Sequence, residues 1–312
     1  GGDKMAGLGL RRYADAGTSA NDGEPSRRHH SAQDRMGVAR WGRGYGAWTK
    51  ADGDAEAAGY DQDTGGFAGG LDVAVDHNWN VGGAIGWSTS DVEFATAGDE
   101  ADVDSFQFAG YAAYESGRYY GDAIVSFGFH DVTSTRLLDL GFDTFIANAN
   151  YDAGTFGVHG EFGAVFDGGR VDVQPFVALG YLSNSTDGFS ESGAGDFGLL
   201  VGDSDADSLA STLGIRFSGT WQAGGVRLIP DAEIAWRHEF LDERQGFSAA
   251  FIEDPSTPFS IVSSALSPDS AIVGVGVGAQ VSRNFVLFLD YNGVLNNSAN
   301  THTASAGLRA TW

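Results

Sequence analysis

Several kinds of residue and segment are scarce in this 312-residue chain, and each scarcity excludes some classes of protein. There is no Cys, which suits a protein that crosses an oxidising compartment unfolded. No apolar run approaches the roughly 18 residues of a membrane helix. Basic residues are few, with 18 Lys and Arg against 42 Asp and Glu, and there is no glycine-rich phosphate loop. We therefore expect no binding of nucleotides or nucleic acid.

Apolar and polar side chains alternate along most of the chain. Phe67, Leu71 and Val73 share one face of an extended segment, and Asp72 lies on the other. The last residues repeat this pattern and end on Trp312. Successive side chains of a strand point to opposite sides, so a strand with one lipid-facing side is apolar at every second residue. The alternation therefore predicts strands that face lipid on one side.

Short turn signals join these segments in pairs. The stretch Asp167-Gly168-Gly169 predicts a tight turn, because its residues accept positive φ. Similar turns are expected at residues 77–79, 116–118, 222–225 and 282–284. With a first strand over residues 41–50, the count reaches about twelve, an even number as in bacterial single-chain barrels. The sequence thus predicts an all-β fold, a transmembrane antiparallel up-and-down barrel.

The strand faces opposite the apolar ones carry many charges. The predicted lumen-facing charges are Asp72, Glu115, Glu161, Arg216, Arg227, Asp231, Glu233, Arg237 and Glu239. A soluble core would not bury so many charges, and a solvated sheet would not display so many Phe and Trp opposite them. A barrel with a polar interior satisfies both conditions.

Long polar connections are expected at one end of this barrel only. They lie near residues 51–61, 96–101, 134–149, 185–207 and 242–270. In outer-membrane barrels short turns face the periplasm and long loops face outward. With an even strand count, residues 1–38 then approach the barrel from the periplasmic side, and residues 39–312 form the barrel itself.

Charge is divided unevenly between these two parts. Residues 1–43 hold eight Lys and Arg against five acids, a net +3 in a chain of net −24, which leaves −27 for the rest. We expect this basic segment, with Arg27, Arg28, Arg35 and Arg40, to be held in the acidic lumen by attraction that a low-dielectric wall screens poorly. The alternative is a disordered, solvated tail. Full protease access to Arg27 and Arg28 in the folded protein would exclude the plug.

The sequence resembles the C-terminal translocator domain of the autotransporters, the type V secretion family, over roughly residues 36–312. The stretches that carry the resemblance are residues 41–46, 59–70, 246–278, 289–293 and 307–312. Barrel-assembly machinery recognises a terminal motif in this family that corresponds to Ser305, Gly307, Ala310 and Trp312. Members usually end in Phe, and Ala310 is smaller than the usual residue at its position.

This resemblance implies a twelve-stranded barrel with a helix in its pore, supplied by residues 1–38. It implies a domain that brings a covalently attached N-terminal passenger to the cell surface without nucleotide hydrolysis. No secretory signal opens the sequence, so we expect a piece of a longer exported chain whose passenger lies outside it. Some relatives cut the passenger free at an Asn-Asn pair. Here Asn296-Asn297 lies between the last two predicted strands, so self-cleavage is not expected.

The resemblance also implies the partners and location of the domain. We expect a monomer without a cofactor in the bacterial outer membrane, with the passenger at the cell surface. The expected partners are the barrel-assembly machinery, periplasmic chaperones, outer-membrane lipid and lipopolysaccharide.

Other chemistry has weaker support. Asp203, Asp205 and Asp207 alternate and are candidate calcium ligands, although acidic loops that are solvated or bridged to lipopolysaccharide explain them as well. The neighbouring Gly202-Asp203-Ser204 lacks a matching downstream Asp and His, so no catalysis is expected there. In His130-Asp131 and His238-Glu239 the two side chains point to opposite faces of a strand and cannot form a dyad. The sequence therefore predicts no enzyme, and the alternative to a translocator is a passive, porin-like channel.

Overall fold

The computed structural model describes residues 37–96, 98–241, 246–264 and 267–312. Almost all of these residues belong to strands. The strands of the main sheet are β1 (Val38–Ala51), β2 (Tyr60–Ala74), β3 (Trp79–Phe94), β4 (Glu100–Ser116), β5 (Tyr119–Asp139), β6 (Thr144–Ala164), β7 (Val171–Thr186), β10 (Ser204–Gly219), β11 (Trp221–Ala223), β12 (Val226–Glu239), β15 (Asp269–Gln280), β16 (Phe285–Leu295) and β17 (Ala299–Thr311). In this part of the chain, no helix is long and apolar enough to cross a membrane.

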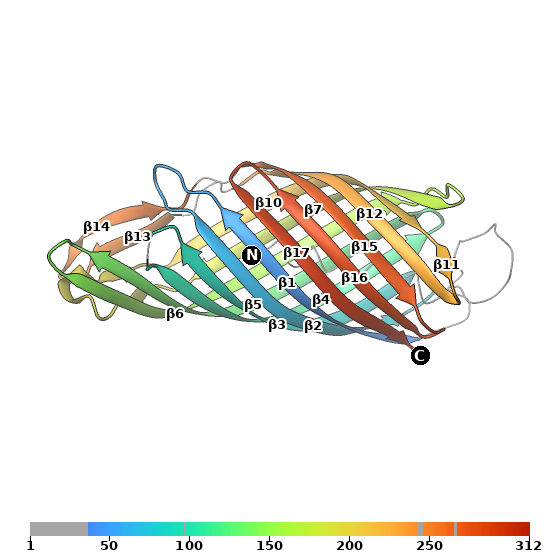
Figure 1. Cartoon of the computed structure of the whole chain (residues 1–312), viewed down its shortest axis with the longest axis horizontal. Helices are drawn as coiled ribbons and strands as arrows, with labels where there is room; N and C mark the ends of the chain where they lie inside the picture. The colour runs from blue at the N-terminus through green and yellow to red at the C-terminus, as the bar shows by residue number, and fades with distance from the viewer. Residues whose placement is uncertain (1–36, 97, 242–245, 265–266) are drawn as a thin grey trace.

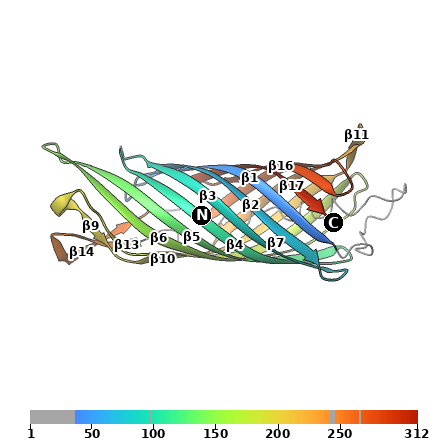
Figure 2. The same ribbon diagram turned by 90° about the horizontal axis from the view of Figure 1, so that it is seen from below.

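The main sheet is antiparallel and closes on itself (Figure 1). Neighbouring strands follow the chain order, β17 returns to pair with β1, and β10 pairs with β12 to complete the circle. Seen from below, the strands run at a steep tilt around one long tube (Figure 2). The expected all-β barrel is therefore confirmed.

The short strand β11 is a continuation of β10. Ser218 of β10 pairs with Asp231, and Trp221 of β11 pairs with Leu228 in the same register. Between these pairs, Pro230 is the residue that would oppose Gly219, and proline has no backbone N–H to donate to a ladder. Because β10 and β11 together cross the barrel wall once, the thirteen strands of the sheet correspond to twelve wall-spanning strands, as predicted.

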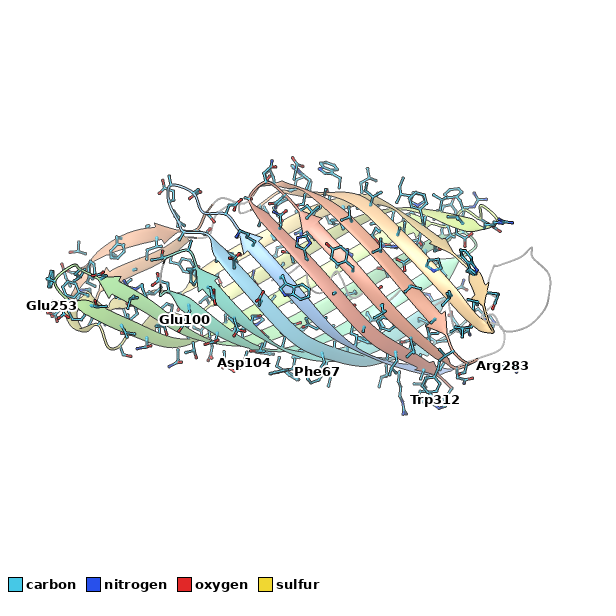
Figure 3. The ribbon with its side chains drawn as sticks, in the orientation of Figure 1. Phe67, Glu100, Asp104, Glu253, Arg283 and Trp312 are labelled. Atoms are coloured by element: carbon cyan, nitrogen blue, oxygen red, sulfur yellow. The ribbon has the colours of Figure 1, made fainter. Side chains whose placement is uncertain are left out.

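Side chains alternate between the lumen and the outside as the sequence predicts. On β2, Phe67 is 59% exposed, whereas Asp72 is 5% exposed. Phe67 points away from the barrel wall (Figure 3). Outer aromatic rings contact one another across strands, with 5.3 Å between the centroids of Phe108 and Phe127 and again between those of Phe127 and Phe156. Such an outer surface requires an apolar surrounding, which in a barrel is lipid.

Tight turns connect the strands at one end, which we call the short-turn end. In the β2–β3 turn, the Oδ1 atom of Asp76 accepts hydrogen bonds from the backbone N–H groups of Asn78 (2.7 Å) and Trp79 (2.9 Å). These two donors hold the pKa of the Asp76 carboxyl below its usual value. Gly169 has a φ of +85° in the β6–β7 connection, at the predicted Asp-Gly-Gly turn. Side-chain acceptors and glycines thus fix these turns locally.

The opposite end, which we call the long-loop end, holds more regular structure than the sequence predicts. The expected loop over residues 134–149 is wrong, because β5 continues to Asp139 and β6 begins at Thr144. Polar pairs hold this extension together, including a 2.9 Å hydrogen bond from Thr133 to Asn150. A strand beyond the membrane needs no apolar face, so hydropathy alternation cannot reveal it.

Two further expected loops, at residues 185–207 and 242–270, contain a second sheet. It consists of β8 (Phe189–Ser190), β9 (Leu199–Val201), β13 (Gly246–Phe251) and β14 (Asp254–Val262), in the order β14-β13-β9-β8, with a helical turn η3 (Gly195–Phe197) before β9. Arg136 of β5 anchors it, because its Nε atom donates to Oε1 of the buried Glu191 at 2.8 Å. The edge strand β14 carries Pro255 and Pro258.

Glycines of the barrel wall make room for aromatic rings in the lumen. A Cβ atom on Gly82 would lie 2.3 Å from the ring of Tyr111, and one on Gly163 would lie 2.5 Å from the ring of Tyr120. These distances are shorter than any van der Waals contact, so any larger residue at these positions would force the ring to move. Tyr120 is 2% exposed and packs with Phe176 and Ala235 in one of the small lumenal clusters.

We expect Gly82→Ala to destabilise the barrel, because the added methyl group overlaps the Tyr111 ring and forces it to move. Overpacking of this kind costs about 1–3 kcal/mol. The measurement is the urea midpoint of unfolding in detergent. Gly110→Ala is the matched control, since a Cβ there meets nothing within 4 Å. Equal losses in the two variants would contradict the steric explanation.

Candidate functional site

The lumen is the candidate functional site, and its wall carries the charges that the sequence assigns to it. Strand parity places Asp72, Glu115, Glu161, Arg216, Arg227, Asp231, Glu233, Arg237 and Glu239 on the inner faces of β2, β4, β6, β10 and β12. Most are shielded, while Glu115 lies exposed near the short-turn end. The nine side chains thus lie on the lumenal side of five strands.

Arg216 is the centre of one charged network. Its guanidinium donates to Glu233 (2.8 Å) and to Glu161 (3.2 Å), and all three side chains are largely buried. Tyr120 donates its hydroxyl to Glu161 at 2.6 Å, and the Arg216 guanidinium lies 4.7 Å from the centroid of the Phe176 ring. The network spans β5, β6, β7, β10 and β12, so it joins five adjacent strands from the inside.

A second ion pair was not anticipated from the sequence. Arg309 of β17 donates from its Nη2 atom to Oδ1 of Asp72 on β2 at 2.6 Å, across the intervening strand β1. Alternation in the last strand places Arg309 on the face opposite Leu308, which was the available signal for a lumenal position. Its partner lies 237 residues away and could not be found by spacing.

Elsewhere in the lumen, charges are held by neighbouring strands. Glu239 accepts hydrogen bonds from the Ser208 hydroxyl (2.6 Å) and the Leu209 backbone N–H (2.7 Å), and lies 3.6 Å from Arg237. On β16, Asp290 accepts a hydrogen bond from Ser305 at 3.3 Å. The lumenal surface is thus ordered by side-chain hydrogen bonds and ion pairs.

The terminal motif residues lie on both faces of β17. Ser305 and Gly307 face the lumen, and a Cβ on Gly307 would lie 2.4 Å from the Phe288 ring. Ala310 is buried on the outer face, between its cross-strand neighbours Arg40 and Phe285, and Trp312 is exposed. Packing against the Phe288 ring therefore favours glycine at position 307, independently of any recognition by assembly machinery.

One predicted plug residue belongs to the barrel wall. Arg40 lies on the outer face of β1, and its guanidinium sits 5.0 Å from the centroid of the Trp312 ring. The assignment of Arg40 to the pore plug is therefore wrong. The assignment rested on the net positive charge of the segment, and charge does not show that the first strand begins at Val38. Arg27, Arg28, Arg35 and the expected pore helix lie outside the described residues.

The three candidate calcium ligands do not come together. Asp203 accepts a hydrogen bond from the Gly188 backbone N–H (2.7 Å), and Asp207 accepts one from the Tyr181 hydroxyl (2.9 Å) on the outer face of β10. Among the residues that the structure describes, no group of three or more acids or histidines could hold a metal ion. The calcium hypothesis therefore has no support in the geometry.

The His-acid sequence pairs are separated as predicted. His130 faces the lumen, hydrogen-bonded to Ser105 and Thr155 at 2.8 Å each. His238 faces outward and bonds Asp269 at 2.9 Å, while Glu239 faces inward. Ser204, beside Asp203, donates its hydroxyl to the Gly246 carbonyl at 3.2 Å. None of these placements assembles the dyads that the adjacent residues suggest.

Comparison with known proteins gives this architecture a family. The family model described as the autotransporter beta-domain matches residues 40–292, most of the barrel. The chain belongs to that family. Its fold also matches the translocator domain of the autotransporter NalP from Neisseria meningitidis, with a TM-score of 0.72 at 14% identity over 99% of this chain and 95% of that one. This is the fold of an outer-membrane translocator.

Further relatives agree. The beta domain of the Bordetella autotransporter BrkA matches with a TM-score of 0.64 at 21% identity, over 88% of this chain and 99% of that one. An extracellular serine protease of Serratia marcescens is 27% identical over 273 residues, 87% of this chain and 26% of that protein. Outer membrane protein B of Rickettsia prowazekii is 24% identical over 84% of this chain and 17% of that protein. The chain thus spans about a quarter or less of these curated relatives.

We expect Arg216→Gln to destabilise the folded autotransporter domain. The substitution leaves Glu161 and Glu233 facing each other without their shared cation, and breaking a buried pair in this way costs about 3 kcal/mol. Unfolding in urea, followed by tryptophan fluorescence, measures the loss. Arg283→Gln, in the exposed β15–β16 turn at the short-turn end (Figure 3), is the control and should cost little. A similar loss in both variants would mean that the network adds nothing.

The lumen of the described strands should favour cations. Nine acids face it against six arginines: Asp72, Glu115, Asp122, Glu161, Asp172, Asp231, Glu233, Glu239 and Asp290 against Arg43, Arg136, Arg216, Arg227, Arg237 and Arg309. Fixed negative charge on a pore wall raises the local cation concentration. In a bilayer under a KCl gradient, a chain beginning near Met36 should show a reversal potential of cation sign, reduced by Asp172→Asn. An anion preference would contradict this reading.

Proposed function

We propose that this domain inserts in the bacterial outer membrane and brings an N-terminal passenger to the cell surface without nucleotide hydrolysis. Residues 1–38 are the linker and pore plug in this proposal, with Arg27, Arg28 and Arg35 attracted to the lumenal acids. Residues 39–312 are the translocator barrel. The proposal gives this domain a transport role and no catalytic one.

The position of β1 is the observation that carries the proposal. Val38 begins β1 at the short-turn end, where its carbonyl accepts a hydrogen bond from the Trp312 backbone N–H at 3.2 Å. Both the start of the barrel and the end of the chain therefore lie at one end (Figure 1). In the proposal, the segment that precedes Val38 enters the tube at this end and passes through it toward the long-loop end.

The proposal also includes an orientation in the membrane and a set of partners. Short turns of outer-membrane barrels face the periplasm, so the long-loop end with Glu253 faces the cell exterior (Figure 3). The terminal motif at Ser305, Gly307, Ala310 and Trp312 is proposed to be read by the barrel-assembly machinery, after periplasmic chaperones deliver the chain. Outer-membrane lipid contacts the exposed aromatic face, lipopolysaccharide lies beside its outward rim, and the domain acts as a monomer.

Single-channel conductance tests the translocator role. The intact 312-residue chain in a planar bilayer should conduct weakly, because the basic segment occupies the lumen. A chain beginning near Met36 should conduct several-fold better. As a matched control, Arg283→Gln in the intact chain should leave conductance low. Equal, large conductance of the intact and shortened chains would instead indicate a passive, porin-like channel.

A further inference from the structure

The contact between β1 and β17 is unlike the other contacts of the barrel. Thirteen residue pairs join these strands, from Ala39 with Thr311 to Ala51 with Ala299. The other barrel strands pair with the barrel strand before or after them in the chain, whereas β1 and β17 lie at opposite ends of the described barrel. We call this contact the seam. Closing it brings together the two most distant strands, so it carries the largest loss of chain entropy.

Arg309 and Asp72 form an ion pair that spans the seam rather than lying within it. In register, Arg309 opposes Trp41 on β1, and Trp41 opposes Gly70 on β2, two residues from Asp72. The side chains of Arg309 and Asp72 are 11% and 7% exposed, and the N–O distance is 2.6 Å. This contact can form only when β17 is paired with β1 and β1 is paired with β2.

Two aromatic residues extend the pair over β1 and β4. The indole N–H of Trp41 donates to the Tyr111 hydroxyl at 2.9 Å, and that hydroxyl lies 3.5 Å from Oδ2 of Asp72. Gly70 leaves the space for the indole, since a Cβ there would lie 2.7 Å from Cζ2 of Trp41. The group therefore ties β17, β1, β2 and β4 together on the lumenal side of the seam.

A comparable ion pair elsewhere in the wall provides the contrast. Arg216 of β10 reaches Glu161 of β6 across β7 at 3.2 Å, with side chains 12% and 11% exposed. The geometry matches that of Arg309 and Asp72, which also skip one strand. The barrel strands β6, β7 and β10, however, follow one another in the chain, so this pair does not join the first strand to the last.

We propose that Arg309 and Asp72 are the latch of the seam: their pairing across β1 sets how readily β17 separates from β1 once the barrel has closed. The latch acts on the closed barrel and does not depend on the translocator role. Its loss should therefore open one contact of the wall and leave the others intact. Arg309 is a positioning residue in this role, not a group that contacts cargo.

Hydrogen exchange of the intact chain, folded in detergent, tests the latch strand by strand. In Arg309→Gln and in Asp72→Asn, amides of β1 and β17 should exchange about ten-fold faster, while those of β6 and β7 keep their rates. In Arg216→Gln the pattern should reverse, with faster exchange in β6, β7, β10 and β12 and unchanged rates in β1 and β17. The proteins are refolded from urea without assembly machinery. A change in how that machinery recognises the C-terminal strand therefore cannot affect the exchange rates.

A charge-exchanged variant guards against loss of folding in the single variants. Asp72→Arg combined with Arg309→Asp should restore slow exchange at β1 and β17, if attraction between the two side chains holds the seam. Two results would overturn the latch: faster exchange spread evenly over all strands in Arg309→Gln, or a charge-exchanged protein whose seam exchanges as fast as that of the single variants.

Discussion

The need to pair every backbone N–H and C=O group in lipid is the constraint on which the rest of this structure depends. Hydrocarbon offers no partner for these groups, and an unsatisfied one costs several kcal/mol, so a sheet in a membrane must have no open edge. The pairing of β17 with β1 and of β10 with β12 meets this need. The ladder between β10 and β12 is interrupted opposite Pro230, but β11 resumes the pairing with β12 in the same register.

Closure also decides where polar chemistry can lie. The outer face contacts lipid, so the buried Arg216 and Arg309 networks and the glycine-aromatic contacts such as that of Gly82 with Tyr111 are all on the inside. In a soluble domain these groups would be at the surface and would contribute little. Here they are shielded by the wall and by each other, so the lumen serves both as the passage and as the place where strands are held together.

Alternation of apolar and polar residues predicts the barrel, its twelve strands and the inward orientation of residues such as Glu161 and Glu233. It does so because lipid imposes this pattern on every strand that crosses the membrane. It fails where lipid is absent: the ends of β5 and β6 and the sheet of β8, β9, β13 and β14 look like polar loops in the sequence. Arg40 was misplaced because charge does not mark the start of a strand. The Arg309–Asp72 pair requires the register of three strands, which no local pattern contains.

The two prolines of β14 have a consequence for how such domains share a membrane. An edge strand that stands clear of the lipid could add a strand from a neighbouring molecule. Pro255 and Pro258 have no backbone N–H, so β14 offers fewer hydrogen-bond donors to a second copy that would extend the sheet. Many copies could therefore sit side by side at high density without fusing into a ribbon at the cell surface.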